Sequence, residues 1–250
     1  MRKDNRPNDE IRQITIKPNY LKYAEGSALI SNGDTKVICS ATIEETIPTW
    51  IKNSNKIHGW ITAEYGMLPR STHSRNIRDI FRSNGRRLEI SRFIGRSLRS
   101  AINLEKLGPR TCMIDCDVIQ ADGGTRTASV TGGYVALAIA LLKLINQGSI
   151  PIDTIKYDIA AISCGILDND KLLDLDYKED KQVDVDANIV MNGIGEFIEV
   201  QLTSEGKPIA QSDINELLAL SSGGLERIFH IQREILEKIK DSQEIKIEDY

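Results

Sequence analysis

The chain has 250 residues, of which 40% are hydrophobic and 27% charged, and its formal net charge at pH 7 is −4. This composition is typical of an ordinary soluble globular protein, with enough chain for one sizeable α/β domain or two small packed ones. We expect neither a membrane span nor a secretory signal, because no apolar run reaches about 18 residues and the N-terminus is polar. Four cysteines without a CxxC pair and three histidines favour buried, reduced thiols in a cytoplasmic protein over a zinc site.

Strand patterns come first along the chain. Stretches rich in β-branched residues and punctuated by Gly and Asn predict four strands, at 11–17, 26–33, 35–45 and 59–65. The pair Asn32-Gly33 predicts a hairpin turn between the second strand and the third.

Two helices and a fifth strand follow. Apolar residues recur every four positions from Ile90 to Ile102, which predicts a helix over 87–107 that Gly108 and Pro109 end. A strand is expected at 111–120, and an apolar helix at about 126–147.

The second half of the chain has a similar order. It predicts strands at 155–167, 171–177, 183–192 and 196–204, the last two as a hairpin, then an amphipathic helix at about 212–240 and a mobile polar tail at 241–250. We therefore predict one α/β or α+β domain over residues 1–240, with two similar halves, 1–150 and 151–240.

Two helix starts carry arginine where the helix dipole disfavours it, in the segments Asn84–Arg87 (NGRR) and Gly123–Arg126 (GGTR). A cation in a first helical turn costs roughly 0.3–1 kcal/mol, unless backbone N–H groups and the guanidinium bind an anion there together. Glycines let an anion approach the backbone, and Thr125 offers a hydroxyl donor. The two motifs favour phosphate sites; a tight turn with a solvated arginine is the alternative.

Charge is distributed unevenly along the chain. Residues 70–99 hold nine arginines, no lysine and only two acids, although the net charge of the whole chain argues against nucleic-acid binding. Arginine suits phosphate oxygens and stacks on bases, so this window favours contact with an RNA or DNA backbone over its alternative, a solvated helix face.

The segment 168–186 has the opposite charge, with eight acids and three lysines. If 180–188 is a strand, Asp180, Asp184 and Asp186 lie on one face, where they either bind cations such as Mg²⁺ or arginine, or form a solvent-facing edge. No nucleophile–base pair is evident. Anion sites and carboxylates without such a pair point to phosphoryl transfer by positioning and charge stabilisation.

Four long motifs together resemble bacterial RNase PH, a family of phosphate-dependent exoribonucleases also known as tRNA nucleotidyltransferases. The motifs stand at 59–76, 89–102, 114–138 and 199–206, and the resemblance extends over roughly residues 2–238 without large insertions. It implies a fold of duplicated βαβα units with helices on mixed sheets. It also implies that phosphate attacks the 3′-terminal phosphodiester of RNA, chiefly the trailer of tRNA precursors, and releases nucleoside diphosphates.

The resemblance assigns roles to residues. It implies phosphate binding by Arg86, Gly124, Thr125 and Arg126, general-acid or Mg²⁺-binding roles for Asp180 and Asp186, and tRNA binding by Arg70, Arg75 and Arg78. It further implies a ring of six copies, built as a trimer of dimers. The chain departs from the family pattern at Asn5 and Leu202, where glycine is usual, and in the loop 52–58.

Two alternatives remain open. One is a non-catalytic RNA-binding ring subunit of an exosome-like complex; such a subunit is expected to lack part of the phosphate loop or the aspartates, and this chain has both. The other is an active exosome-type subunit that needs a partner chain. The sequence of the segment 127–138 favours a bacterial enzyme that forms a ring from copies of one chain.

Overall fold

A computed structural model describes residues 2, 4–77 and 85–244 of the chain. Its first sheet has five strands in the order β1-β2-β3-β5-β4. These strands are β1 (Ile14–Pro18), β2 (Gly26–Asn32), β3 (Thr35–Glu44), β4 (Trp60–Met67) and β5 (Thr111–Gln120). All neighbours run antiparallel except β4 and β5, which are parallel, so the sheet is mixed. The predicted hairpin is confirmed, since Asn32 pairs with Thr35 across a two-residue turn.

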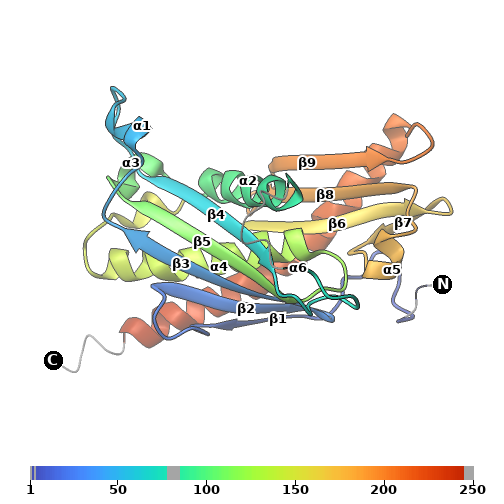
Figure 1. Ribbon diagram of the computed structural model, residues 1–250, viewed down its shortest axis with the longest axis horizontal. Coiled ribbons are helices and arrows are strands. Elements are labelled where there is room, and N and C mark those ends of the chain that lie inside the picture. The colour runs from blue at the N-terminus through green and yellow to red at the C-terminus, as the bar shows by residue number, and fades with distance from the viewer. Residues whose placement is uncertain (1, 3, 78–84, 245–250) are drawn as a thin grey trace.

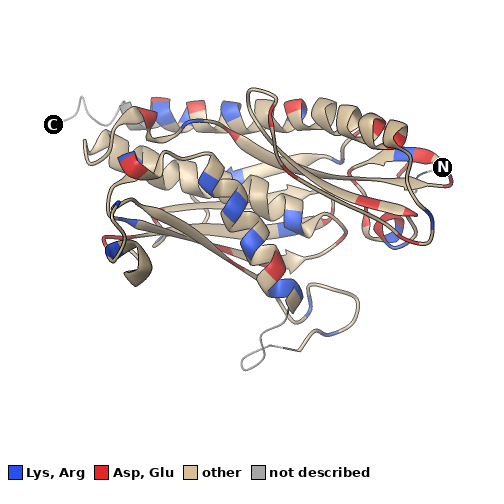
Figure 2. Ribbon diagram, turned by 90° about the horizontal axis from the view of Figure 1, so that it is seen from above, with Lys and Arg blue, Asp and Glu red and all other residues tan. Residues whose placement is uncertain are grey.

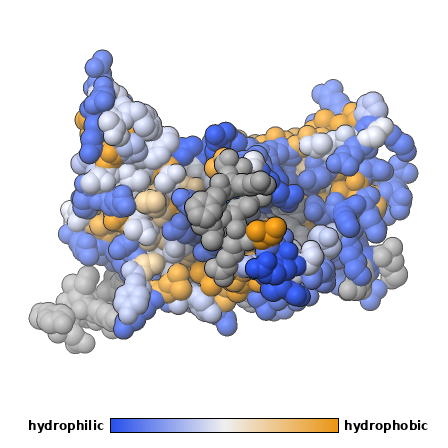
Figure 3. Space-filling view, viewed as in Figure 1, coloured by the Kyte–Doolittle hydropathy of each residue, from blue (hydrophilic) through white to orange (hydrophobic). Residues whose placement is uncertain are grey.

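The second sheet has four strands in the order β7-β6-β8-β9 and is antiparallel throughout. Its strands are β6 (Ile159–Leu167), β7 (Asp170–Leu173), β8 (Val185–Asn192) and β9 (Phe197–Ser204). The hairpin predicted at 183–204 is formed by β8 and β9. Figure 1 shows the two sheets beside each other, and Figure 3 shows a mostly hydrophilic surface over the side formed by β6–β9.

The helices cover and join the sheets. They are α1 (Thr49–Lys52), α2 (Gly85–Ser100), α3 (Leu104–Leu107), α4 (Thr125–Asn146), the 3₁₀ turn η1 (Ile152–Thr154), α5 (Tyr177–Asp180) and α6 (Gln211–Glu244). The α2 helix packs on β4 and touches β9, so it reaches both sheets. The α6 helix packs on β1 and on β6–β8, and runs diagonally behind both sheets (Figure 1).

The α4 helix lies at the centre of the molecule. It packs on β2, β3 and β5 of the first sheet and on β6 of the second. Every residue from Thr127 to Leu142 is buried. By length and composition this 22-residue helix could cross a membrane, but 83% of its most apolar window is buried inside the protein. Its apolar character is therefore explained by packing on two sheets, and the expectation that no apolar segment is long enough to span was wrong.

Three element boundaries differ most from the predictions. The strand predicted at 171–177 ends at Leu173, and Tyr177 begins α5. The helix predicted over 87–107 ends at Ser100, because Ile102 forms a β-bridge with Ile155 and takes the chain out of the helix. A separate short helix, α3, then starts at Asn103, whose side chain accepts hydrogen bonds from the N–H groups of the first turn. At the other end of the chain, residues 241–244 continue α6 instead of belonging to a polar tail, and 245–250 lie outside the described residues.

The core holds all four cysteines. Cys39, Cys112, Cys116 and Cys164 are buried and form no disulfide, as predicted. Burial raises the pKa of Cys112 and Cys164 to about 12, which keeps these thiols protonated and unreactive. They contribute to packing rather than to chemistry.

Candidate active site

The glycine loop before α4 is shaped by two consecutive residues with left-handed backbone conformation. Gly123 has a φ of 76° and Gly124 a φ of 65°, which glycine adopts at little cost. A Cβ on Gly123 would lie 2.4 Å from the carbonyl oxygen of Leu175. The space next to Gly123 is thus filled by the backbone between β7 and α5. The glycine brings the two halves of the chain together at this point, a reason that the sequence pattern did not indicate.

The first turn of α4 presents polar groups at a half-buried surface. Gly124 is the N-cap residue and makes no side-chain cap, so it leaves first-turn N–H groups available to an anion. The hydroxyl oxygens of Thr125 and Tyr65 lie 2.9 Å apart, within hydrogen-bond distance. Arg126 donates to Gln201 Oε1 at 2.7 Å and forms an ion pair with Glu89 at 3.3 Å. Its guanidinium is therefore held in place by α2 and β9.

Arg86 stands in the first turn of α2, and its charge acts on the same groups as that of Arg126. Both arginines lower the pKa of the Tyr65 phenol, although burial dominates and raises it. Both also oppose the upward pKa shifts of Asp180 and Asp186. Residues from α2, β4, α4, α5 and β8 therefore lie within electrostatic reach of one another. The arginines of the two helix starts that the sequence singled out therefore act on the same carboxylates.

The two aspartates come from different elements, so the prediction that they share one strand was wrong. Asp180 is the last residue of α5, and Asp186 is the second residue of β8. Desolvation raises the pKa of Asp180. Desolvation, then the charge of Asp180, raises the pKa of Asp186 to about 6. The Oδ1 atom of Asp186 is buried and has no hydrogen-bond partner among the described residues, whereas Oδ2 accepts from Asn188 at 3.5 Å.

A buried ionic cluster behind the glycine loop was missed by the sequence analysis. Asp174 accepts from the Arg12 guanidinium at 2.7 and 3.0 Å and from the Arg12 backbone N–H at 2.8 Å. Arg12 also donates to the carbonyl oxygen of Asp122 at 2.5 Å. The arginine charge holds the pKa of Asp174 below its usual range despite complete burial. Arg12 therefore ties the glycine loop to the second half of the chain.

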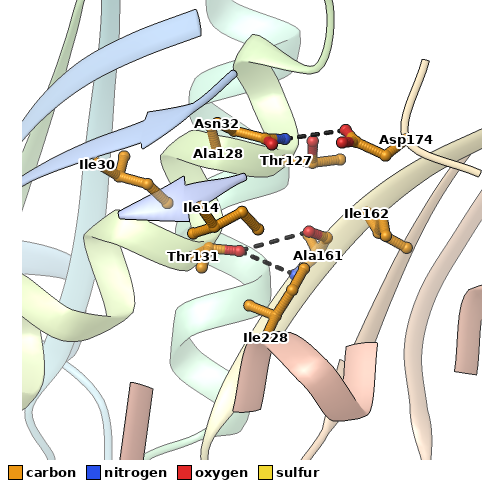
Figure 4. Close-up of a pocket in the computed structure, with 10 residues that line it drawn as sticks. All are labelled: Ile14, Ile30, Asn32, Thr127, Ala128, Thr131, Ala161, Ile162, Asp174 and Ile228. Carbon is orange, nitrogen blue, oxygen red and sulfur yellow. Dashed lines mark hydrogen bonds between the residues drawn. The ribbon is translucent and has the colours of Figure 1, made fainter. Parts of the chain in front are cut away.

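The same cluster takes in two more N-terminal arginines and one polar side chain. Arg2 and Glu179 form a buried bidentate pair with both distances at 2.7 Å, and Arg6 contacts Asp174 at 3.3 Å. Asn32 donates to Asp174 at 2.9 Å beside a cavity of about 10 Å³ (Figure 4). The sequence shows the charged residues of this cluster, which are three arginines near the N-terminus and the acids of 168–186. It could not predict which of them form pairs, because they lie far apart in the chain.

The arginine-rich window divides into two parts. On α2, Arg87 pairs with Glu64 at 3.0 Å, Arg96 pairs with Glu199, and Arg99 donates to the carbonyl oxygen of Ile61 at 2.8 Å. These three are structural contacts of a helix along which basic positions repeat (Figure 2). These three arginines therefore contact the protein itself, and their predicted contact with a nucleic acid stays a prediction.

The loop after β4 carries the other part. Arg70 and Arg75 are exposed, and Arg78 lies outside the described residues. The carbonyl oxygen of Ser71 accepts from the N–H of Ala121 at 2.8 Å, and the ring of His73 lies 6.1 Å from that of Tyr177. The loop therefore starts beside the glycine loop and reaches α5. Arg70 and Arg75 therefore lie on a loop next to the site, and their exposed side chains are not part of the site itself.

The family departures have local explanations. Asn5 has a φ of 60°, a conformation that glycine adopts freely and that asparagine tolerates better than most residues. Leu202 is half-buried on β9 and packs against the core of the second sheet. The loop 52–58 follows α1 and lies away from the residues of the site.

Comparison with known proteins agrees with this arrangement. Models of the 3′ exoribonuclease family match the chain over residues 10–143 (domain 1) and 159–224 (domain 2). A curated ribonuclease PH of Moorella thermoacetica is 52% identical over 232 residues, which cover 92% of both chains.

Solved structures share the fold. Rrp46 from rice (Oryza sativa) superposes with a TM-score of 0.77 at 20% identity, over 94% of this chain and 100% of that one. A chain of the Archaeoglobus fulgidus exosome with RNA bound to the active site gives a TM-score of 0.74 at 22% identity, over 95% and 92%. The matched segments contain Arg86, the glycine loop and both aspartates. The chain belongs to the 3′ exoribonuclease family and is a phosphate-dependent 3′ exoribonuclease of the RNase PH type.

Proposed function

We propose that this exoribonuclease trims the 3′ ends of tRNA precursors, and that Arg86, Gly124, Thr125 and Arg126 bind the attacking phosphate. The observation that carries the assignment is the meeting of two helix N-termini, each with an arginine, at a pair of carboxylates. Free backbone donors and guanidinium groups are the groups that bind phosphate in proteins. In this proposal, the two carboxylates supply a proton or bind a metal ion.

The reaction follows from this placement. An oxygen of phosphate forms a bond to the 3′-terminal phosphorus, and the bond from that phosphorus to the preceding ribose 3′ oxygen breaks. The leaving oxygen takes up a proton, and the products are a nucleoside diphosphate and an RNA one nucleotide shorter with a 3′ hydroxyl. Asp180 or Asp186 supplies this proton when it is not bound to a metal ion, because burial raises the pKa of both carboxyls in the metal-free protein, that of Asp186 to about 6. Arg86 and Arg126 stabilise the charge on the transferred phosphoryl group.

Mg²⁺ is part of the proposal, with Asp180 and Asp186 as its protein ligands. Among the described residues, no group of three or more potential metal ligands occurs. Two carboxylates suffice for Mg²⁺, which keeps several waters and shares phosphate oxygens of the substrate. The unpartnered Oδ1 of Asp186 fits a ligand role. When bound, the ion would neutralise charge on the phosphoryl oxygens.

Asp186→Asn is expected to stabilise the metal-free protein at pH 8 by up to about 2 kcal/mol and to change its stability little at pH 4. The pKa of Asp186 in the folded protein, about 6, lies above that of an unfolded aspartate. The wild type therefore loses stability as the pH rises from about 4 to about 6, and the amide variant does not. Urea unfolding in the presence of a chelator measures this difference.

Asp184→Asn is the matched control, because Asp184 is an exposed neighbour on the same segment and its replacement should change little. Added Mg²⁺ should then stabilise the wild type more than Asp186→Asn. If Mg²⁺ stabilises the wild type and Asp186→Asn equally, Asp186 is not a ligand of the metal ion.

RNA contact is assigned to Arg70, Arg75 and Arg78. Combined replacement of Arg75 and Arg78 by alanine should weaken tRNA binding and lower the slope of log affinity against log salt by about 2, since each phosphate contact contributes about 0.9. Fluorescence anisotropy with labelled tRNA at several salt concentrations measures both quantities. Arg227→Ala is the control, because Arg227 is half-exposed on α6 and pairs with an exposed acid, Glu10, at 3.1 Å. A similar change of slope in the control would refute the assignment.

We also propose that six copies form a ring, as a trimer of dimers, and that the enzyme acts in the cytoplasm. The likeness to exosome subunits supports a ring assembly, and four buried free thiols suit a reducing compartment. Light scattering should give six times the chain mass of 27.9 kDa. A monomeric or dimeric mass for an active protein would overturn the ring.

The test of the proposed function is trimming of a tRNA that carries a short 3′ trailer, with and without inorganic phosphate. We expect nucleoside diphosphates, produced only when phosphate is present and by this chain alone. Monophosphates released without phosphate would contradict the mechanism. RNA binding without any products would favour the alternative of a non-catalytic or partner-dependent ring subunit.

A further inference from the structure

Tyr65 connects the two helices whose N-termini carry the arginines of the site. Its side chain extends from β4 and is 4% exposed. Its backbone N–H donates to Ser91 Oγ of α2 at 3.0 Å. Its hydroxyl lies 2.9 Å from Thr125 Oγ1, at the start of α4. One residue therefore contacts both α2 and the hydroxyl of Thr125, to which we assigned phosphate binding above.

The electrostatic surroundings favour the phenol as a proton donor. Burial raises the pKa of Tyr65, and this exceeds the opposing effects of Thr125, Arg86 and Arg126. The phenol thus stays protonated at neutral pH. A threonine hydroxyl has a single proton to donate and can accept at the same time. If Tyr65 donates to Thr125 Oγ1, the threonine proton remains available for another acceptor.

We propose that Tyr65 is a positioning residue for the phosphate substrate, because its hydroxyl donates to Thr125 and directs the threonine proton toward a phosphate oxygen. In the described part of the chain, Tyr65 is the side chain found in hydrogen-bond contact with Thr125 Oγ1. The inference rests on the proposed function, in which Thr125 binds phosphate. It adds a residue that acts through Thr125 and does not itself touch the substrate.

Tyr65→Phe removes the hydroxyl and keeps the buried ring. We expect the KM for phosphate to rise about five- to tenfold, while kcat at saturating phosphate falls less than about threefold, since a charge-assisted hydrogen bond weakens without loss of the arginines. Thr125→Val should raise the KM at least as much. Thr125→Ser keeps the hydroxyl and should stay within about twofold of the wild type.

The double variant of Tyr65→Phe with Thr125→Val decides whether Tyr65 acts through Thr125. Its KM should equal that of Thr125→Val within about twofold, because a residue that acts through a partner has no effect once the partner is removed. Losses that multiply would mean direct contact of Tyr65 with phosphate, and would overturn the positioning role. An unchanged KM in Tyr65→Phe would also overturn it.

Tyr134→Phe is the matched control for a lost buried hydroxyl. Tyr134 lies on α4, the helix that Thr125 begins, and its hydroxyl donates to Asp158 at 2.9 Å. Both phenylalanine variants should lower the melting temperature by similar amounts, but only Tyr65→Phe should change the KM for phosphate. Equal changes of KM in both variants would show a structural effect and refute the inference. A wild type whose activity does not depend on phosphate would instead contradict the proposed function itself.

Discussion

Arg126→Ala is expected to lower kcat/KM for phosphate by about 10²–10³-fold and to leave tRNA affinity within about twofold. Arg126 is held by Gln201 and Glu89 at the start of α4, so its guanidinium is in place before the substrate arrives. A donor fixed in advance stabilises developing charge without the cost of reorganisation. Arg86→Ala should have an effect in the same direction, because Arg86 acts on the same carboxylates.

The measurement is steady-state phosphorolysis with phosphate varied at saturating RNA, together with tRNA binding in the absence of phosphate. Arg126→Lys should not restore activity fully, since an ammonium group lacks the planar fork that grips two phosphate oxygens. Arg87→Ala is the control on the neighbouring helix, where Arg87 forms an exposed pair with Glu64. If Arg126→Ala weakens tRNA binding as much as phosphorolysis, the separation between phosphate site and RNA surface is incorrect.

Asp174→Asn is expected to destabilise the protein by about 3–5 kcal/mol, the largest effect on stability that the structure indicates. The carboxylate is buried, with Arg12 and Arg6 as charge partners, so its removal leaves guanidinium groups uncompensated. Asp174 has a φ of 54°, and asparagine also tolerates this conformation. The substitution therefore tests the charge and not the backbone.

Urea unfolding at several pH values measures this effect. The pKa of Asp174 is lowered in the folded protein. Its contribution to stability is therefore present above the unfolded pKa of about 3.9 and is lost as the pH falls further toward the folded pKa. The difference between wild type and variant should stay constant from pH 5 to 8 and shrink below about pH 4. Lys171→Ala, which breaks a surface pair with Asp213 and Glu216, should cost far less stability than Asp174→Asn, because surface ion pairs contribute little. A similar cost for both variants would contradict the assigned role of the buried cluster.

The sequence by itself determined the local elements and singled out the two helix starts that we propose to bind phosphate. Period-two and period-four patterns depend on neighbouring residues, so they predicted the strands of both sheets and the helices α4 and α6 to within a few residues, whereas the helix that contains α2 was predicted to continue to residue 107. The GGTR and NGRR segments were recognisable because a cation at a helix N-terminus contradicts a local rule. The long motifs, including 114–138, identified the family.

The tertiary structure alone decided which of these residues meet. Asp180 and Asp186 share the site although a helix end and a strand carry them, because β7, α5 and β8 fold back on Gly123. The pairing of Arg12 with Asp174 spans 162 residues of the chain, and that of Tyr65 with Thr125 spans 60. Such contacts depend on how sheets and helices pack, and no local pattern records their partners. The sequence therefore singled out the groups that we propose to bind phosphate, whereas the fold determined which side chains hold them in place.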